Sequence, residues 1–214
     1  MTMTPSLDET TTNAPLSVAL RTSTAEAHEA AEHSSFMDDL IGGRLDKAAF
    51  TRLQEQSWHF YKAMEEAARD LKDDMGDIYD VVLERLGTLE HDIAELGGTV
   101  DAPILPATQE YVDRLKAIHD AKAAHRLVAH HYVRYLGDLS GGQVIGRMMQ
   151  RHYDVSEEAT TFYDFPFKRK PYKDKYRESL DALSLTEEQR AELLQEASDA
   201  FIFNQRVFQD LETA

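Results

Sequence analysis

The sequence has no cysteine, few basic residues and no long apolar run, and each absence excludes a class of protein. Without cysteine there is no disulfide, thiolate zinc site or iron–sulfur ligand, so a metal must be held by His, carboxylate, Tyr or Met. The 23 Lys and Arg stand against 39 Asp and Glu, a formal net charge of -16. Because affinity for a phosphate backbone comes from Lys and Arg, we expect neither nucleic acid nor an anionic membrane surface as a partner.

Membrane-spanning and secretory segments are also missing from the pattern. The apolar runs fall far short of the roughly 18 residues that a membrane-spanning helix needs. Residues 1–15 have no basic start and no apolar stretch, so we expect a disordered Thr-rich tail rather than a secretory signal. With 42% apolar and 29% charged residues, the composition is that of a soluble globular protein, and we expect it to be cytoplasmic.

Apolar residues recur at helical spacing between the prolines and glycines. No segment alternates with period two, and no repeat is present, so the sequence predicts a single all-α domain over residues 16–214 with seven to nine helices. Thr186 and Gln189 fit a capping box that opens the last helix. The expected helices cover residues 16–34, 46–71, 107–119, 121–153, 172–183 and 186–211, with two shorter ones between residues 71 and 98.

Three glycines lie within six residues of the long helical segment, at Gly137, Gly141 and Gly142. A glycine inside a helix costs about 1 kcal/mol relative to alanine, so this cluster calls for an explanation. The four-residue spacing places Gly137 with Gly141 and Asp138 with Gly142, in two adjacent columns of one helix face. That face lets backbone approach a flat ligand closely, with Asp138 beside it. A close helix crossing, or a kink, is the alternative explanation.

The first helix contains His28 and, four residues later, Glu32. A histidine that binds a metal usually donates its second ring N–H to a partner such as a carboxylate. Arg21 lies seven residues before His28, about two turns or roughly 10 Å along the same face. This spacing suits a cation at the carboxylate edge of a ligand whose centre is bound by His28. A surface His–Glu pair is the alternative.

A basic island stands out on the otherwise acidic chain. Lys173 and Arg177 are four residues apart and share a helix face, which indicates a local anion site more than a solvated basic turn. Asp174 is the one acid within residues 168–177. The basic residues of this island are Lys168, Arg169, Lys170, Lys173, Lys175 and Arg177.

Other candidates are weaker. His125, His130 and His131 share the long helix and could each bind a metal, but adjacent residues point about 100° apart, so His130 and His131 cannot chelate one ion from one face. Asn204 interrupts an apolar stripe in the last helix. It is either a buried hydrogen-bonding residue beside a cavity or a partner of a helix end.

Four stretches together resemble the haem oxygenase family in its soluble bacterial form. The resemblance spreads over nearly the whole chain after the tail, and segment 160–171 is the least family-like. The stretches are TAEAHEAAEHSSFM (24–37), HHYVRYLGDLSGGQVIGRMMQ (130–150), YKDKYR (172–177) and AFIFNQ (200–205).

The resemblance implies a helical domain with haem between a proximal N-terminal helix and a Gly-rich distal helix. It makes His28 the proximal iron ligand, with Glu32 as its hydrogen-bonding partner. Phe201 and Asn204 match pocket-lining positions on the last helix.

On the distal side, the resemblance makes Gly137, Gly141 and Gly142 the stretch that lies against the haem face. Asp138 matches the acid that holds a distal water network.

The propionate edge follows in the same way. The resemblance implies that Arg21, Lys173 and Arg177 pair with the haem propionates, and that Tyr132 lies near the porphyrin edge. Many relatives carry Lys where this chain has Arg21, which keeps the charge but changes its geometry. Lys168, Arg169 and Lys170 cannot be assigned individually.

The resemblance also implies an activity. Haem would be both cofactor and substrate, opened with dioxygen and electrons, as expected at the α-meso carbon, to biliverdin, carbon monoxide and ferrous iron. Asp138 would supply a proton through water. The sequence has no flavin or nicotinamide site, so electrons would come from a ferredoxin or a flavoprotein reductase, and iron acquisition would be the physiological role.

Two other classes of function remain open. A haem carrier or storage protein could use the same His28 and cations, but it would not need the glycines with Asp138. A related helical fold also serves cofactor-synthesis and thiamin-salvage enzymes, which need neither the histidine nor the cations.

Overall fold

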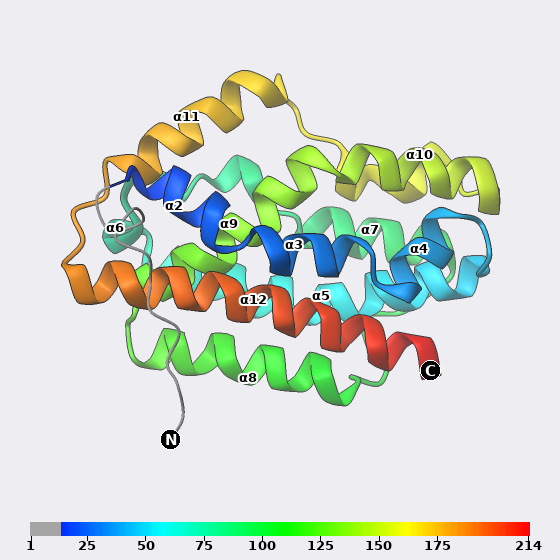
Figure 1. The fold of residues 1–214 in the computed structure, drawn as a ribbon. Helices are drawn as coiled ribbons and strands as arrows, with labels where there is room; N and C mark the ends of the chain where they lie inside the picture. Colours follow the sequence, from blue (N-terminus) through cyan, green and yellow to red (C-terminus); the bar gives the residue numbers. More distant parts are fainter. Residues whose placement is uncertain (1–13) are drawn as a thin grey trace.

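The structure is a computed structural model in which residues 14–214 are described, and these residues form eleven α-helices, three 3-10 helices and no strand (Figure 1). The predicted tail therefore lies outside the described residues, apart from Ala14 and Pro15. The α-helices are α2 (Leu16–Ser23), α3 (Ala25–Glu32), α4 (Ser35–Ile41), α5 (Lys47–Asp70), α6 (Lys72–Met75), α7 (Leu86–Leu96), α8 (Pro106–Asp120), α9 (Ala124–Ser140), α10 (Gly142–Tyr153), α11 (Arg169–Asp181) and α12 (Glu187–Thr213). The 3-10 helices are η1 (Gly76–Ile78), η2 (Val81–Leu83) and η3 (Glu157–Tyr163).

The longest helix, α12, organises the bundle. It packs against α8 and α9, and also against the N-terminal helices α2, α3 and α4. Figure 1 shows α12 running alongside α8, with α2, α3 and α4 in a row along α12 and α11 at the edge of the molecule. Helices from the two ends of the chain therefore meet, which brings α3 and α9 to the same long helix. None of the helices within residues 14–214 is long and apolar enough to span a membrane.

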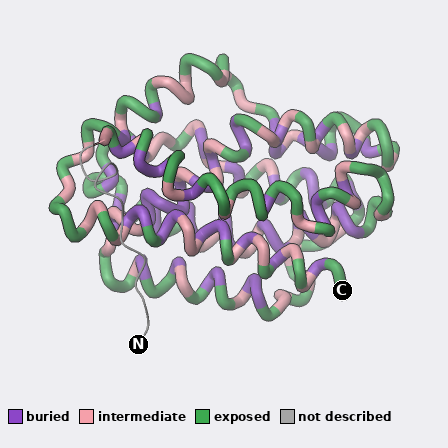
Figure 2. The backbone as a smooth tube through the Cα atoms, viewed as in Figure 1, coloured by how far each residue is buried: buried purple, intermediate pink, exposed green. Residues whose placement is uncertain are grey.

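The core forms where the amphipathic faces meet, as the buried segments in Figure 2 show. The helical spacing of apolar residues over 46–71 predicts one buried stripe on α5, and this is confirmed because all of its members are buried. Each large apolar side chain removed from water contributes about 1.5–3 kcal/mol to folding. The stripe consists of Phe50, Leu53, Ser57, Tyr61, Met64, Ala68 and Leu71.

The predicted first helix, 16–34, is wrong as a single element, because it breaks at Thr24 into α2 and α3. Thr24 has φ -100° and ψ 1°, and its hydroxyl donates to the Leu20 carbonyl over 2.8 Å. Such back-bonding from Thr to the preceding turn commonly bends helices. The break sets the direction of α3, and with it that of His28, independently of α2.

The predicted distal helix, 121–153, also breaks, at Gly141 between α9 and α10. The kink that glycine clusters favour is therefore present, so that alternative explanation of the cluster holds in part. The predicted pair of short helices between 71 and 98 is also wrong. That region contains α6, η1, η2 and α7, and Gly87 lies inside α7 instead of separating two helices.

The remaining boundaries differ less. Helix α11 begins at Arg169, three residues before the expected start, so Arg169 and Lys170 lie in its first turn. The predicted capping box of the last helix is confirmed, since Thr186 and Gln189 exchange both hydrogen bonds. These breaks and short turns explain why the expected seven to nine helices fall short of the eleven in residues 14–214.

A buried ionic cluster joins α8, α9 and α12 around Glu196, whose side chain is 1% exposed. The carboxylate accepts hydrogen bonds from Arg114 through Nε and Nη2, from Arg126 over 3.3 Å and from His130 over 2.9 Å. Burial alone would raise the pKa of Glu196. The hydrogen bonds from His130 and Arg114 outweigh it and lower the pKa from 4.5 to about 2.

This cluster predicts a loss of stability in acid. The lowered pKa of Glu196, about 2 against 4.5, corresponds to roughly 3 kcal/mol at neutral pH. Because the folded-state pKa is depressed, this contribution is complete above about pH 4.5 and is lost as the pH falls towards 2. In thermal melts at pH 7, we expect Glu196→Gln to unfold at a lower temperature than wild type. The difference in melting temperature between the two proteins should become smaller below pH 4.5.

The control is Glu192→Gln, one turn earlier on α12, whose carboxylate also pairs with Arg126 but is 33% exposed. Its effect should be clearly smaller, because exposed ion pairs are screened by water. A Glu196→Gln protein as stable as wild type at pH 7 would contradict the role of the cluster.

Candidate active site

His28 lies on α3 with a side chain that is 50% exposed, and its Nε2 is 3.5 Å from Oε1 of Glu32. The predicted His–Glu proximity is therefore present, as an i,i+4 contact longer than a normal hydrogen bond. The His28 ring packs edge-on against Phe201 of α12, with centroids 5.6 Å apart and planes at 76°. Phe201 thus supports one side of the ring, while half of the side chain stays accessible to a ligand.

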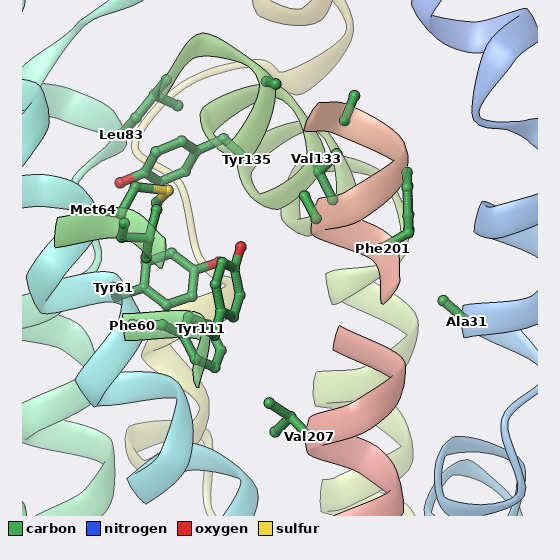
Figure 3. Close-up of a cluster of buried hydrophobic side chains, with 14 of the residues drawn as sticks. Ala31, Phe60, Tyr61, Met64, Leu83, Tyr111, Val133, Tyr135, Phe201 and Val207 are labelled. Atoms are coloured by element: carbon green, nitrogen blue, oxygen red, sulfur yellow. The ribbon is translucent and has the colours of Figure 1, made fainter. Parts of the chain in front are cut away.

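A side chain of α12 also binds the backbone of α3. Gln205 Nε2 donates to the carbonyl oxygen of Ala27 over 3.2 Å, next to His28 in the chain. Figure 3 shows Phe201 on the side of α12 that faces α3, where Ala31 lies, with Phe60, Tyr61 and Tyr111 grouped on the other side. The last helix therefore separates the aromatic core from the histidine-bearing helix and contacts both.

The two predicted columns of the glycine cluster face different surroundings. Gly137 is exposed, and a Cβ built on it meets no atom within 4 Å. A Cβ on Gly141 meets only the carbonyl oxygen of Gly137, at 3.7 Å. This column is an open stretch of bare backbone. The neighbouring column, Asp138 and Gly142, is buried against the bundle.

Gly142 has a packing explanation of its own. A Cβ there would lie 2.7 Å from Cδ1 of Tyr163, and one on Gly146 would lie 3.3 Å from Cδ2 of the same ring. The two glycines therefore form a seat for Tyr163, which comes from η3. Gln143 strengthens this contact, since its side-chain amide donates to the Tyr163 carbonyl. The positions of Gly137 and Gly141 thus suit the expected haem contact. At Gly142, the ring of Tyr163 fills the space that a side chain would take.

Asp138 is 7% exposed and belongs to a hydrogen-bonded chain across three helices. Its Oδ2 accepts the hydroxyl of Tyr61 from α5. Nε of Arg134 donates to the same hydroxyl oxygen over 3.2 Å, and Nη1 donates to Oδ1 of Asn204 over 2.7 Å. Asn204 therefore has the first of its two predicted roles, that of a buried hydrogen-bonding residue.

The electrostatics of Asp138 reflect opposed effects. Burial raises the pKa of Asp138 above its ordinary value. The charge of Arg134 and the hydrogen bond from Tyr61 lower it and offset only part of this rise. In the described part of the chain, no hydrogen bond reaches its second oxygen, Oδ1. The acid is thus held in one orientation by Oδ2, with Oδ1 left for water or ligand.

Three cations converge near the same end of α9. Helix α11 packs against both α2 and α9. Burial raises the pKa of Tyr132 on α9, and the charges of Arg177 on α11 and Arg21 on α2 lower it. Lys173 donates to the hydroxyl of Ser140 over 3.1 Å, next to Gly141. Burial lowers the pKa of Lys173, and the charges of Arg177 and Arg169 lower it further. Like charges that repel one another indicate a site for an anion of more than one charge.

The three unassigned basic residues separate in the structure. Lys170 is exposed and pairs with Asp174 over 2.9 Å, and Lys168 precedes α11 as an exposed residue. Arg169 differs, because its Nη1 is buried and has no hydrogen-bond partner among the described residues. It belongs to the cation cluster beside Lys173.

The weaker histidine candidates have structural partners. His125 contacts Glu192, His130 contacts Glu196 and Tyr111, and His131 contacts Tyr176. No group of three or more His, Asp or Glu in residues 14–214 is arranged to hold a metal ion. A metal at His28 would therefore need further ligands from a bound group.

A flat, iron-containing dianion fits these surroundings. The exposed imidazole of His28 offers a metal ligand, the bare backbone of Gly137 and Gly141 admits a planar group, and the cations match two carboxylates. Haem has this combination of iron, planar ring and two propionates.

Comparison with known proteins agrees with this fit. The sequence model described as heme oxygenase matches residues 14–210. The chain belongs to the haem oxygenase family. The heme oxygenase of Guillardia theta is 35% identical over 92% of this chain and 86% of its own length.

Solved structures of the family agree in fold. Heme oxygenase-1 of the cyanobacterium Synechocystis, in complex with heme, has a TM-score of 0.87 and 33% identity, over 94% of this chain and 93% of that one. The heme oxygenase of Leptospira interrogans has a TM-score of 0.86 and 34% identity, over 91% and 98%. The predicted fold class is therefore confirmed, and this chain, like its family, belongs to the enzymes that degrade haem.

Sequence inspection missed Tyr61, Arg134 and Tyr163. Arg134 left a trace, because it is a charged residue in an apolar helix four positions before Asp138. Helical spacing identifies Tyr61 only as a member of the apolar stripe, because spacing does not show which hydroxyl will meet an acid. Tyr163 lies in the segment that resembles the family least.

The two glycine columns predict opposite results for alanine substitution. Gly142→Ala would force a methyl into Tyr163, and we expect it to destabilise the protein by about 1–3 kcal/mol. Gly137→Ala meets open space, so we expect a gain of about 0.5–1 kcal/mol from helix propensity, together with weaker hemin binding.

Urea unfolding and absorption titration with hemin measure these two effects. Hemin binding by Gly137→Ala that equals wild type would exclude this backbone from the ligand face. Unchanged stability of Gly142→Ala would contradict the Tyr163 seat.

Proposed function

We propose that this protein is a haem oxygenase that binds haem between α3 and the glycine column of α9 and opens it to biliverdin, carbon monoxide and ferrous iron. The observation that carries the proposal is the bare backbone of Gly137 and Gly141 beside an oriented, buried Asp138. A carrier would need His28 and the cations, but it would have no use for an acid held by Tyr61 and Arg134.

On the proximal side, His28 holds the haem iron through one ring nitrogen, with Glu32 close enough to orient the ring. Bound haem supplies the iron at which dioxygen is activated and the ring carbon that is oxidised. His28 would be the one protein ligand of that iron, and dioxygen is the proposed co-substrate.

On the distal side, the protein supplies a proton without placing a basic side chain over the oxygen. The guanidinium of Arg134 is engaged by Tyr61 and Asn204, so it is held away from Gly137 and Gly141. Asp138 would hold a water through Oδ1 and pass a proton through it to the dioxygen. The absence of side chains at Gly137 and Gly141 would leave room for dioxygen on this face of the haem, and we expect the ring to be opened at the α-meso carbon.

The remaining parts of the proposal concern the edge of the haem and its partners. Arg21, Lys173 and Arg177 bind the propionates, and Tyr132 lies beside them. A ferredoxin or flavoprotein reductase supplies the electrons. We place the reaction in the cytoplasm, where such reduced donor proteins are available, and assign it to a single domain over residues 16–214.

The test is an absorption titration of the purified protein with hemin, followed by reductant under air. We expect a stoichiometric Soret band that decays into biliverdin absorption while carbon monoxide is released. A Soret band that survives reductant and oxygen would indicate a carrier, and no Soret band would reject haem as the ligand.

His28→Ala should remove the iron ligand from the protein. We expect hemin binding to weaken by about tenfold or more, with an altered ferric spectrum that added imidazole restores. Glu32→Gln is the matched control, because it keeps the imidazole and should shift the spectrum only slightly. An unchanged ferric spectrum in His28→Ala would reject the ligand assignment.

Asp138→Ala should separate binding from turnover. We expect hemin affinity close to wild type and a rate of biliverdin formation lower by about 100-fold or more, because general acid catalysis contributes on that scale. Single-turnover kinetics with reductant under air measure the rate. Normal ring opening by this variant would remove Asp138 from the mechanism.

A further inference from the structure

Helix α11 carries two of the proposed propionate cations but is anchored to the bundle by few buried residues. Of Arg169–Asp181, only Tyr176 and Leu180 are buried. Lys173 precedes Tyr176 by three residues and Arg177 follows it directly, so all three lie within one to two turns. The position of Tyr176 therefore sets the positions of both cations.

Tyr176 meets a buried histidine that the mechanism does not use. Its hydroxyl is 2.7 Å from Nδ1 of His131 on α9, and the two rings are stacked with planes at 3° and centroids 5.8 Å apart. The side chains are 3% and 2% exposed. The ring of Tyr135 also contacts the imidazole of His131, with centroids 4.4 Å apart.

The pair is neutral and therefore suited to burial. Burial lowers the pKa of His131 to about 3, so the imidazole carries no charge at neutral pH. Burial also raises the pKa of Tyr176, so its hydroxyl keeps its proton. A buried hydrogen bond between neutral groups has no charge to desolvate, and breaking it leaves an unsatisfied polar group.

The pair also sets the register between the two helices. Tyr132 follows His131 on α9, and Arg177 follows Tyr176 on α11. Helix α11 packs against α9, so the bonded pair fixes which residues of the two helices lie next to each other. Burial raises the pKa of Tyr132, and the charge of Arg177 lowers it. The hydrogen bond between His131 and Tyr176 thus holds Arg177 at the edge of the site.

The other tethers of α11 are more accessible to water. Ser17 donates to Asp181 at the far end of the helix, and Lys173 donates to Ser140, both in exposed positions. The Tyr172 hydroxyl donates to Asp80 over 2.9 Å in a partly buried position. Water competes for such bonds, so they fix the helix less firmly.

We propose that His131 and Tyr176 are positioning residues whose hydrogen bond aligns Arg177 and Lys173 with the two haem carboxylates and so determines how haem is rotated in the site. This inference rests on the proposed function for the identity of the ligand. Neither residue touches the ligand in this assignment, and both act through α11.

Three variants test the bond by its effect on hemin affinity, measured by absorption titration without reductant. Tyr176→Phe and His131→Leu each remove the bond, and we expect the hemin dissociation constant to rise about three- to tenfold. His131→Asn keeps both a donor and an acceptor near the place of Nδ1, and it should restore wild-type affinity. Thermal melts of each variant show that it is folded.

The matched control is Tyr153→Phe, which removes a 2.7 Å hydrogen bond from the hydroxyl to the Leu40 carbonyl, between α10 and α4. It makes the same chemical change without touching α11, and it should leave hemin affinity unchanged. An equal loss of affinity in this control would show that the effect of Tyr176→Phe is general destabilisation, and it would overturn the proposal.

A double-mutant cycle with Arg177→Ala distinguishes positioning from mere stability. If the bond aligns Arg177, Arg177→Ala should weaken hemin binding less in the His131→Leu background than in wild type. Additive effects would overturn the proposal, because they would show that Arg177 acts equally well without the bond.

The product provides a separate measurement. Under turnover, Tyr176→Phe and His131→Leu should form a mixture of biliverdin isomers where wild type forms one, and His131→Asn should restore the single isomer. Wild type that binds hemin but forms no biliverdin would reject the proposed function, while the affinities and the cycle would still decide the role of His131 and Tyr176. Wild-type affinity in both Tyr176→Phe and His131→Leu would overturn the inference alone.

Discussion

The arrangement of the site depends on the hydrogen bonds that the guanidinium of Arg134 makes. It donates to Tyr61 of α5 and to Asn204 of α12 from its own place on α9, and its charge lies beside Asp138. It also lies over the rings of Phe60 and Tyr61, 4.9 and 5.1 Å from their centroids. A cation in such a place needs several acceptors, because an unpaired charge within a protein is expensive. The three helices must therefore meet in one register, and that register orients Asp138.

The glycine cluster shows how one short sequence serves two surfaces. Gly142, with Gly146, receives the ring of Tyr163, and this contact holds α10 against η3. Gly137 and Gly141 leave backbone open on the other column, where the ligand is proposed to lie. The helix breaks at Gly141, so α9 carries one of these surfaces and α10 the other. Alanine would favour a continuous helix and would lose both surfaces.

The opposite edge of the site gathers cations that the protein neutralises only in part. Burial lowers the pKa of Lys173, and the charges of Arg177 and Arg169 lower it further. Asp174 pairs with Arg177 over 3.0 Å, but both side chains are nearly half-exposed, so this pair is screened by water. Burial of Tyr176 and Leu180 keeps the cations together on α11. Packing of α11 therefore holds these cations near one another.

Local pattern by itself determined the all-α class, the α5 stripe, the capping box at Thr186 and the candidates His28 and Asp138. Each depends on spacing within one or two helical turns, where neighbours in the chain are neighbours in space. Tertiary structure decided the break at Thr24, the Tyr163 seat at Gly142, the Arg134 chain and the pairing of His131 with Tyr176. These depend on partners tens of residues away, such as Arg134 and Asn204, or His131 and Tyr176, which only the packing of α5, α9, α11 and α12 brings together. Helical periodicity shows which face of a helix is buried, but it does not show which buried polar group that face will meet.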